Sequence, residues 1–226
     1  MFRAREYIVF KIAETRSVAV LLETLGADFA GIIGCDYFSS YRCYMRVFGG
    51  VLQFCLAHLI RDVKFLLSLP DAATREYGER FLESLRKLFH IIHNRDQVTP
   101  DKFHSLLKAQ REVIQQTALT QVPDHREARN LAERIRENGE SYFRFISTPG
   151  IEPTNNLAEQ AIRFVVIDRH ITQGTRGEAG RRWCERIWTA MATCHQQGVS
   201  AVHFIRDAVR AYFNGESAPH LLPASN

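Results

Sequence analysis

The chain has 226 residues, of which 46% are hydrophobic and 24% are charged, and its formal net charge is +4 at neutral pH. This composition is typical of a globular protein, and the length suits one large domain or a small domain with an insertion. No apolar run is long enough to cross a bilayer, and no signal-peptide core follows Met1. The odd number of cysteines, five, favours reduced thiols over a disulfide framework. We therefore expect a cytoplasmic protein with no membrane partner, whose mild positive charge permits a nucleic-acid partner.

The first part of the chain alternates between strand and helix patterns. Strands are predicted at residues 7–12, 31–35 and Val51–Phe54, and helices at residues 17–25 and Ser39–Phe48. This order implies parallel crossover connections in an α/β core, with function expected where the strands end. Asp36 stands at such an end.

Four helical patterns follow, separated by Pro70, Pro100 and Pro123. They cover residues 57–69, 72–93, 100–119 and 124–146. Because each pattern carries an apolar stripe that needs burial, we predict a helical subdomain inserted after the α/β beginning.

The chain then reaches a segment with an unusual concentration of polar side chains. Pro153 is followed by three short residues able to cap a helix, namely Thr154, Asn155 and Asn156. The predicted helix carries Glu159 in its first turns and Arg163 four residues later on the same face. From these residues alone, a capping box formed by Asn156 and Glu159 and a surface ion pair of Glu159 with Arg163 are the favoured explanation. Residues 164–167 fit either a longer helix or a strand.

The last part of the chain is predicted to contain two further helices. They cover residues 178–197 and 200–213, after a glycine-containing loop at residues 173–177. In the first of them, the stripe of Trp183, Ile187 and Met191 is expected to form buried core. Residues 214–226 are predicted to be a flexible tail.

Three ordered segments resemble signatures of the insertion-sequence-66 transposases. They are residues 34–41 (GCDYFSSY), 55–61 (CLAHLIR) and 154–163 (TNNLAEQAIR), and the basic stretch at 168–174 is also similar. The resemblance implies a ribonuclease-H-like α/β core with an active site of two aspartates and one glutamate, interrupted by an all-α insertion. Residues 1–55 and 151–213 would form the core and residues 56–150 the insertion.

The same resemblance assigns site residues. Asp36 corresponds to the second catalytic aspartate and Glu159 to the catalytic glutamate, and both would bind divalent metal. In such sites two Mg²⁺ or Mn²⁺ ions about 4 Å apart clamp the attacking and leaving oxygens during DNA cleavage and strand transfer. By its position alone, Asp36 is equally suited to cap the following helix.

DNA, in the form of transposon ends, is the implied partner. The expected contacts are His58, Arg61, Asn155, Asn156, Arg163, Arg169 and His170, since arginine matches phosphate oxygens and the others are polar. The alternative for the basic residues is a solvated face. Cys55 and His58 also have the spacing of half a zinc site, but no second pair at matching spacing follows.

One feature departs from the family pattern. The family's first aspartate lies on a strand upstream of residues 7–12, and residues 1–226 contain no counterpart. The resemblance is therefore to the carboxyl-terminal part of a bacterial transposase, and we expect a truncated copy. The rival interpretations are a catalytically inactive DNA-binding or regulatory fragment, acting on a second copy or on a full-length transposase, and a pseudogene product.

Overall fold

The computed structural model describes residues 1–222, and its contacts divide the chain into two compact units. One unit is Arg16–Asn155, and the other combines Met1–Thr15 with the residues from Asn156 onward. Each unit has its own hydrophobic cluster. The domain boundaries predicted at residues 55, 150 and 213 stay predictions.

The unit Arg16–Asn155 begins with two helices and two strands. They are α1 (Val18–Leu25), β3 (Ile32–Cys35), α2 (Ser39–Phe48) and β4 (Val51–Phe54). β3 and β4 pair in parallel, with Cys35 opposite Phe54. Gly26 and Gly49 follow α1 and α2 with φ of 81° and 70°, a backbone conformation that favours glycine. The sequence predictions for these elements are confirmed.

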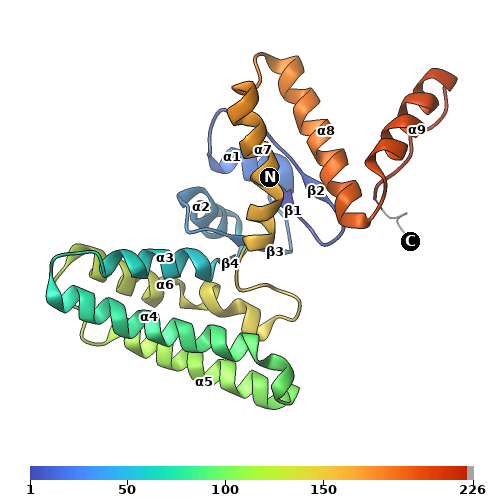
Figure 1. Cartoon of the computed structure of the whole chain (residues 1–226). Helices are drawn as coiled ribbons and strands as arrows, with labels where there is room; N and C mark the ends of the chain where they lie inside the picture. Colours follow the sequence, from blue (N-terminus) through green and yellow to red (C-terminus); the bar gives the residue numbers. More distant parts are fainter. Residues whose placement is uncertain (223–226) are drawn as a thin grey trace. The chain divides into compact units, whose positions relative to one another are not determined.

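Four long helices complete this unit. They are α3 (Leu56–Leu66), α4 (Ala72–His93), α5 (Pro100–Leu119) and α6 (Arg126–Ser147), with a short 3₁₀ helix at Arg95–Gln97. All four lie side by side in Figure 1. The side chain of Asp71 caps α4 by accepting a 2.8 Å hydrogen bond from the N–H of Thr74. The helical pattern predicted for residues 57–146 is therefore present.

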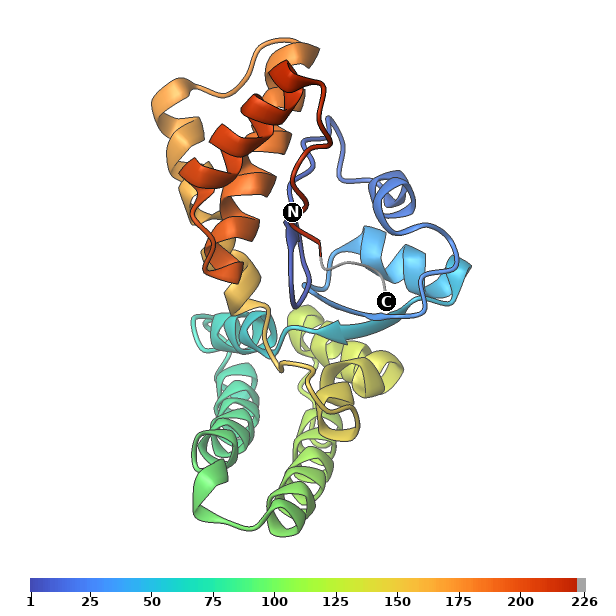
Figure 2. The ribbon, with the colours of Figure 1, turned by 90° about the vertical axis from the view of Figure 1, so that its right-hand side faces the viewer.

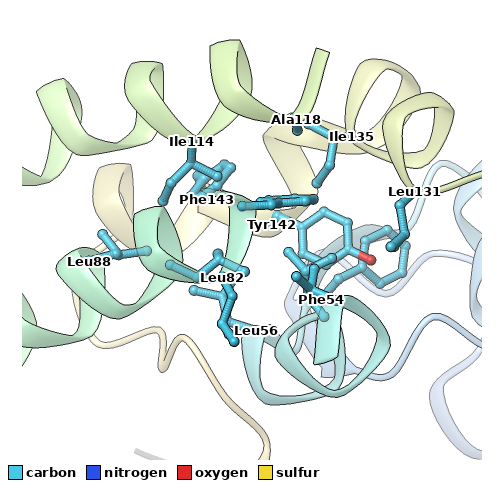
Figure 3. Close-up of a cluster of buried hydrophobic side chains, with 14 of the residues drawn as sticks. Phe54, Leu56, Leu82, Leu88, Ile114, Ala118, Leu131, Ile135, Tyr142 and Phe143 are labelled. Atoms are coloured by element: carbon cyan, nitrogen blue, oxygen red, sulfur yellow. The ribbon is translucent and has the colours of Figure 1, made fainter. Parts of the chain in front are cut away.

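The core of this unit is shared between the helices and the parallel strands. Figure 3 shows Phe54 of β4 close to Tyr142 of α6, with side chains from α3, α4 and α5 around them. The ring centroids of Phe54 and Tyr142 are 5.2 Å apart, and both side chains are fully buried. Gln53, also buried, links β4 to α6 by donating to the carbonyl of Tyr142 at 2.9 Å and accepting from the N–H of Phe145 at 2.9 Å. The helices therefore cover the end of the sheet.

The second unit is built from the chain's two terminal regions. It contains β1 (Phe2–Arg3), β2 (Ile8–Val9), α7 (Asn156–Thr172), α8 (Glu178–Gln197) and α9 (Ala201–Asn214). Figure 2 shows α9 in red in front of α8 in orange, and Figure 1 shows that the two helices meet at the end of α8 and diverge from there. Residues 164–167, whose pattern fitted a helix or a strand, belong to α7. Within residues 1–222 the structure is mostly helical with short strands, so a ribonuclease-H-like core stays a prediction.

The strand predicted at residues 7–12 is wrong in extent and in pairing. Only Ile8–Val9 is a strand, and it pairs with β1 in the antiparallel direction and not with β3 or β4. The N–H groups of Ile8, Phe10 and Ile12 donate to Thr193 Oγ1, Thr189 Oγ1 and Glu185 Oε1, at 3.2, 3.0 and 2.6 Å. Side chains spaced four residues apart on α8 thus take the place of a neighbouring strand.

The buried face of α8 also differs from the prediction. Trp183 and Met191, which were expected in the core, are 64% and 46% exposed. The buried positions include Cys184, Trp188 and Ala192, four residues apart, and Thr193 and Cys194 are buried as well. The contact of Trp188 with Phe10 explains which face of α8 is buried, because the two rings meet edge-on with centroids 5.9 Å apart.

The predicted tail begins one residue later than expected. Asn214 still belongs to α9, which ends at Gly215 with φ of 70°. Residues 223–226 of the predicted tail lie outside the described residues.

Candidate active site

Asp36 directly follows β3, at the carboxyl end of the parallel pair, as predicted. Its Oδ1 accepts a 3.1 Å hydrogen bond from the N–H of Phe38, the residue that precedes α2. Its Oδ2 lies 3.8 Å from Nη2 of Arg16, which is beyond hydrogen-bond distance. The backbone therefore orients one carboxylate oxygen, while the other faces a cation and accepts no hydrogen bond from the described residues.

Two neutral groups, the Cys35 thiol and the Tyr41 hydroxyl, also lie near this carboxylate. Burial raises the pKa of the Cys35 thiol, and the charges of Asp36 and Cys55 raise it further. Burial also raises the pKa of Tyr41 to about 12, with smaller contributions from Cys35 and Asp36. Both groups stay protonated near pH 7, so Asp36 supplies the negative charge at this strand end.

The ends of β3 and β4 lie against the segment that precedes α7. The N–H of Cys55 donates to the carbonyl of Cys35 at 2.8 Å, and the N–H of Leu56 donates to the carbonyl of Pro153 at 2.9 Å. The N–H of Asn155 donates to Sγ of Cys55 at 3.4 Å. The amide oxygen of Asn155 is buried and accepts no hydrogen bond from the described residues. The Asn155 side chain thus provides a buried carbonyl oxygen at this edge of the sheet that has no hydrogen-bond donor among the described residues.

His58 and Arg61 extend from the first turns of α3, which starts at the same edge. His58 is half-buried, whereas Arg61 is exposed. Among residues 1–222, no group of three or more His, Cys, Asp or Glu side chains could hold a metal ion. Within this part of the chain, no third zinc ligand therefore accompanies Cys55 and His58.

A network around Tyr37 fixes the chain next to Asp36. The ring of Tyr37 packs edge-on against Phe54, with centroids 5.0 Å apart. The guanidinium carbons of Arg134 and Arg42 lie 4.1 and 4.5 Å from its centroid. Cation–π contacts of this kind stabilise by about 0.5–2 kcal/mol each. Tyr37 is therefore held from three directions.

Helix α6 supplies the other half of this network. Its backbone is non-helical at Asn138 (φ −125°, ψ 18°), and the Asn138 amide donates to the hydroxyl of Tyr37 at 3.1 Å. Arg134 donates from Nη1 to Asp62 at 2.7 Å and from Nε to the hydroxyl of Tyr142. The resemblance signatures include Tyr37, but nothing in the sequence connected it to Arg134 or Asn138.

Glu159 lies in the first turn of α7, and its side chain is exposed. Asn156, the first residue of α7, and Arg163, one turn after Glu159, are exposed as well. Glu159 and Asp36 belong to different compact units, so the distance between their carboxylates stays a prediction.

Two predicted DNA contacts lie further along the same helix. Arg169 and His170 occupy its last turn, and both are exposed. Arg16, which faces Asp36, was not predicted, because nothing in the pattern of residues 7–25 distinguishes it from a solvated arginine.

The geometry can be compared with known proteins. The amino-acid sequence matches the Transposase IS66 family over residues 1–182, most of the chain. The chain belongs to the IS66 family of transposases. The match includes Asp36, the helices α3–α6 and Glu159, and the predicted family is confirmed. Membership in the IS66 family indicates a role in DNA transposition.

Comparisons with curated proteins and with solved structures found no significant match for this IS66-family chain. In residues 1–222, no helix combines the length and the apolar character required to cross a membrane.

Proposed function

We propose that the chain acts in DNA transposition and that Asp36 and Glu159 bind the divalent metal ions that support strand cleavage and transfer. The observation that carries this proposal is the position of Asp36, within the matched range, at the carboxyl end of a parallel strand, with one oxygen that accepts no hydrogen bond from the described residues. In α/β folds, ligands bind at such strand ends.

The residues at this strand end fit a hard cation. Mg²⁺ prefers carboxylate and carbonyl oxygens and keeps several waters, and Asp36 Oδ2 and Asn155 Oδ1 are oxygens that accept no hydrogen bond from the described residues. When bound, two Mg²⁺ or Mn²⁺ ions would polarise the phosphate and activate the attacking oxygen. The N–H of Phe38 keeps the carboxylate of Asp36 in one orientation, which preorganises the site before any ion enters.

Chain connectivity supports a site shared by Asp36 and Glu159. Asn155 contacts Cys55 at the strand end, and Glu159 is only four residues further along the chain. Four residues span at most about 14 Å, and three residues of helix rise only about 4.5 Å. Glu159 can therefore reach the strand end, and we expect its carboxylate to lie within about 10 Å of that of Asp36, close enough for ions about 4 Å apart to bridge.

A crosslinking experiment tests this distance. The double variant Asp36→Cys, Glu159→Cys is expected to be joined by a short bismaleimide, whereas Asp36→Cys, Arg169→Cys is the matched control further along α7. Cys35, Cys55, Cys184 and Cys194 are buried, so they react slowly. The variant Asp36→Cys alone corrects for Cys43. Equal crosslinking of the two double variants, or none, would contradict the shared site.

DNA would be held by the polar and basic residues of the matched motifs. They are His58, Arg61, Asn155, Asn156, Arg163, Arg169 and His170. Exposed arginines release counterions from the phosphates that they neutralise, so binding is expected to weaken steeply with salt.

Nicking of supercoiled plasmid in Mg²⁺ or Mn²⁺ tests the function. The family pattern assigns two of its three carboxylates within residues 1–226, and its first aspartate has no counterpart there. Removing one member of a catalytic unit typically lowers the rate by several orders of magnitude, so this chain alone is expected to nick weakly or undetectably. Salt-sensitive DNA binding is expected to persist.

The comparison is with Glu159→Gln, and Glu152→Gln, a neighbouring exposed glutamate, is the control. Strong nicking that Glu159→Gln abolishes and Glu152→Gln preserves would mean that a third ligand lies within residues 1–226. If the unsubstituted chain neither nicks nor binds DNA, the proposed function is contradicted.

A further inference from the structure

The end of the α7–α8 hairpin exposes apolar side chains that a folded protein normally buries. Ile171 in the last turn of α7 is 77% exposed, and Trp183 in α8 is 64% exposed. Arg186 lies three residues after Trp183, so the two side chains share a face of α8. We name residues 169–186 the hairpin tip.

Trp183 is exposed although α8 buries side chains directly next to it. The neighbouring residue Cys184 is buried, as is Trp188 one turn later. Trp188 meets the rings of Phe10 and Phe164 edge-on, at centroid distances of 5.9 and 6.4 Å. With Cys184 and Trp188 turned inward, the helix directs Trp183 outward.

The charged residues of the hairpin tip are predominantly basic. Arg169, Arg176 and Arg186 are exposed and form no ion pair with the described residues. His170 is exposed too, whereas the remaining two arginines of the tip are paired, Arg181 with Glu14 at 3.6 Å and Arg182 with Glu178 at 2.5 Å.

Two further acidic groups lie in the tip or next to it, and neither offsets these cations at the surface. Glu185 is half-buried and accepts a 2.6 Å hydrogen bond from the N–H of Ile12. Asp168 directly precedes the tip. It is half-buried, and its charge adds to burial in raising the pKa of Cys184, which places it toward the hairpin core. A partner approaching the tip therefore meets an aromatic ring and three unpaired guanidinium groups.

This combination matches nucleic acid better than it matches an apolar protein surface. Aromatic side chains stack on bases that are not paired in a duplex, and arginines bind the phosphates on either side. A purely apolar partner would leave the three guanidinium groups without counterions when it covered the tip.

We propose that the hairpin tip binds DNA with unpaired bases, with Trp183 stacking on a base and Arg169, Arg176 and Arg186 contacting phosphates. This inference rests on the proposed function in one respect, that DNA is the partner. It is independent of the metal chemistry at Asp36 and Glu159, since the tip binds in the absence of any ion.

Fluorescence gives a direct test, because the chain contains only two tryptophans. In Trp188→Phe the emission comes from Trp183 alone, and a single-stranded oligonucleotide added in EDTA is expected to quench it. In Trp183→Phe the emission comes from buried Trp188, and the same oligonucleotide is expected to leave it unchanged. Quenching of Trp188 and not of Trp183 would overturn the stacking.

Affinities measured in the otherwise unchanged chain test the same contact. Trp183→Ala is expected to weaken binding of the single-stranded oligonucleotide roughly 5- to 150-fold, the range for one lost base stack. Tyr212→Ala is the matched control, because Tyr212 is an aromatic residue 80% exposed on α9. An unchanged affinity in Trp183→Ala, or an equal loss in both variants, would overturn the proposal.

Salt dependence tests the arginines separately. Arg176→Gln is expected to reduce the slope of log affinity against log salt by about 0.7, the value for one phosphate contact on a single strand. Arg210→Gln, an exposed arginine on α9, is expected to leave the slope unchanged. A duplex that binds as tightly as the single strand, with no effect of Trp183→Ala, would mean binding by charge alone.

The outcomes separate this inference from the active-site proposal. Failed crosslinking between positions 36 and 159, with intact quenching of Trp183, would remove the shared metal site and leave the hairpin tip. Normal DNA binding that ignores Trp183 and Arg176 would overturn the inference and leave the active-site proposal standing.

Discussion

Tyr142→Ala is expected to lower the free energy of unfolding of the unit Arg16–Asn155 by about 3–5 kcal/mol, the range for removing a buried aromatic ring. Tyr142 is fully buried, and its ring lies next to that of Phe54 in Figure 3, with centroids 5.2 Å apart. It also stacks on the ring of Tyr37, with centroids 6.3 Å apart. Its hydroxyl also accepts a hydrogen bond from Arg134, whose guanidinium lies 5.3 Å from the ring. The variant therefore leaves both a cavity and a guanidinium with one partner fewer.

Two further variants separate these contributions. Tyr142→Phe keeps the ring and removes the acceptor for Arg134, so a loss of about 1–3 kcal/mol is expected. Phe65→Ala is the control, because the Phe65 side chain on α3 is 54% exposed and its removal leaves no buried cavity.

Urea unfolding followed by circular dichroism at the helical band measures the losses, since α3–α6 hold much of the helix. A loss for Tyr142→Ala no larger than that for Phe65→Ala would mean that the core closes over the missing ring.

Thr193→Val is expected to destabilise the other unit by about 2–6 kcal/mol. Thr193 is 2% exposed, and its hydroxyl both accepts from the N–H of Ile8 at 3.2 Å and donates to the carbonyl of Ile8 at 3.1 Å. Valine has nearly the same shape, so the substitution removes two hydrogen bonds without leaving a cavity. Each buried backbone group left without a partner costs about 1–3 kcal/mol.

Tryptophan fluorescence follows this unit selectively, because Trp183 and Trp188 both belong to it. Thr175→Val, an exposed threonine in the turn after α7, is the control and is expected to change stability by less than about 0.5 kcal/mol. If Thr193→Val unfolds at the same urea concentration as the wild type, the backbone of Ile8 must find other partners.

The elements that the sequence predicted well are those decided by neighbouring residues. Helix α2 and strand β4 have the predicted bounds because the pair Gly49-Gly50 separates them, and Gly49 adopts the positive φ of 70° that ends a helix. The four long helices were equally clear, because prolines and polar caps mark their ends.

The errors arose where distant residues decide the structure. The segment at residues 7–12 has the composition of a strand, but Thr189, Thr193 and Glu185 on α8 take its N–H groups. In α8 itself, two apolar stripes compete, and the ring of Phe10 selects the one that contains Trp188. Periodicity along one helix contains no information on that choice.

The candidate site also has one part that neighbouring residues predict and one part that depends on distant residues. The position of Asp36 after a strand follows from local pattern, because β3 is a short apolar run that ends at Cys35. The anchoring of Tyr37 by Arg134 and Asn138 joins residues about a hundred positions apart. Residue separation of that size leaves no signal in a single sequence.

The shared core of β4 and the long helices limits how this chain can vary. Leu52 and Phe54 are fully buried, and Tyr142, Phe143 and Leu56 lie in the same cluster. In a relative with an unrelated segment in place of α3–α6, these strand residues would lose their packing partners. Such a relative would need compensating substitutions in β4. The helices and the strand that precedes Cys55 should therefore be inherited together, and recombination breakpoints between them should be selected against.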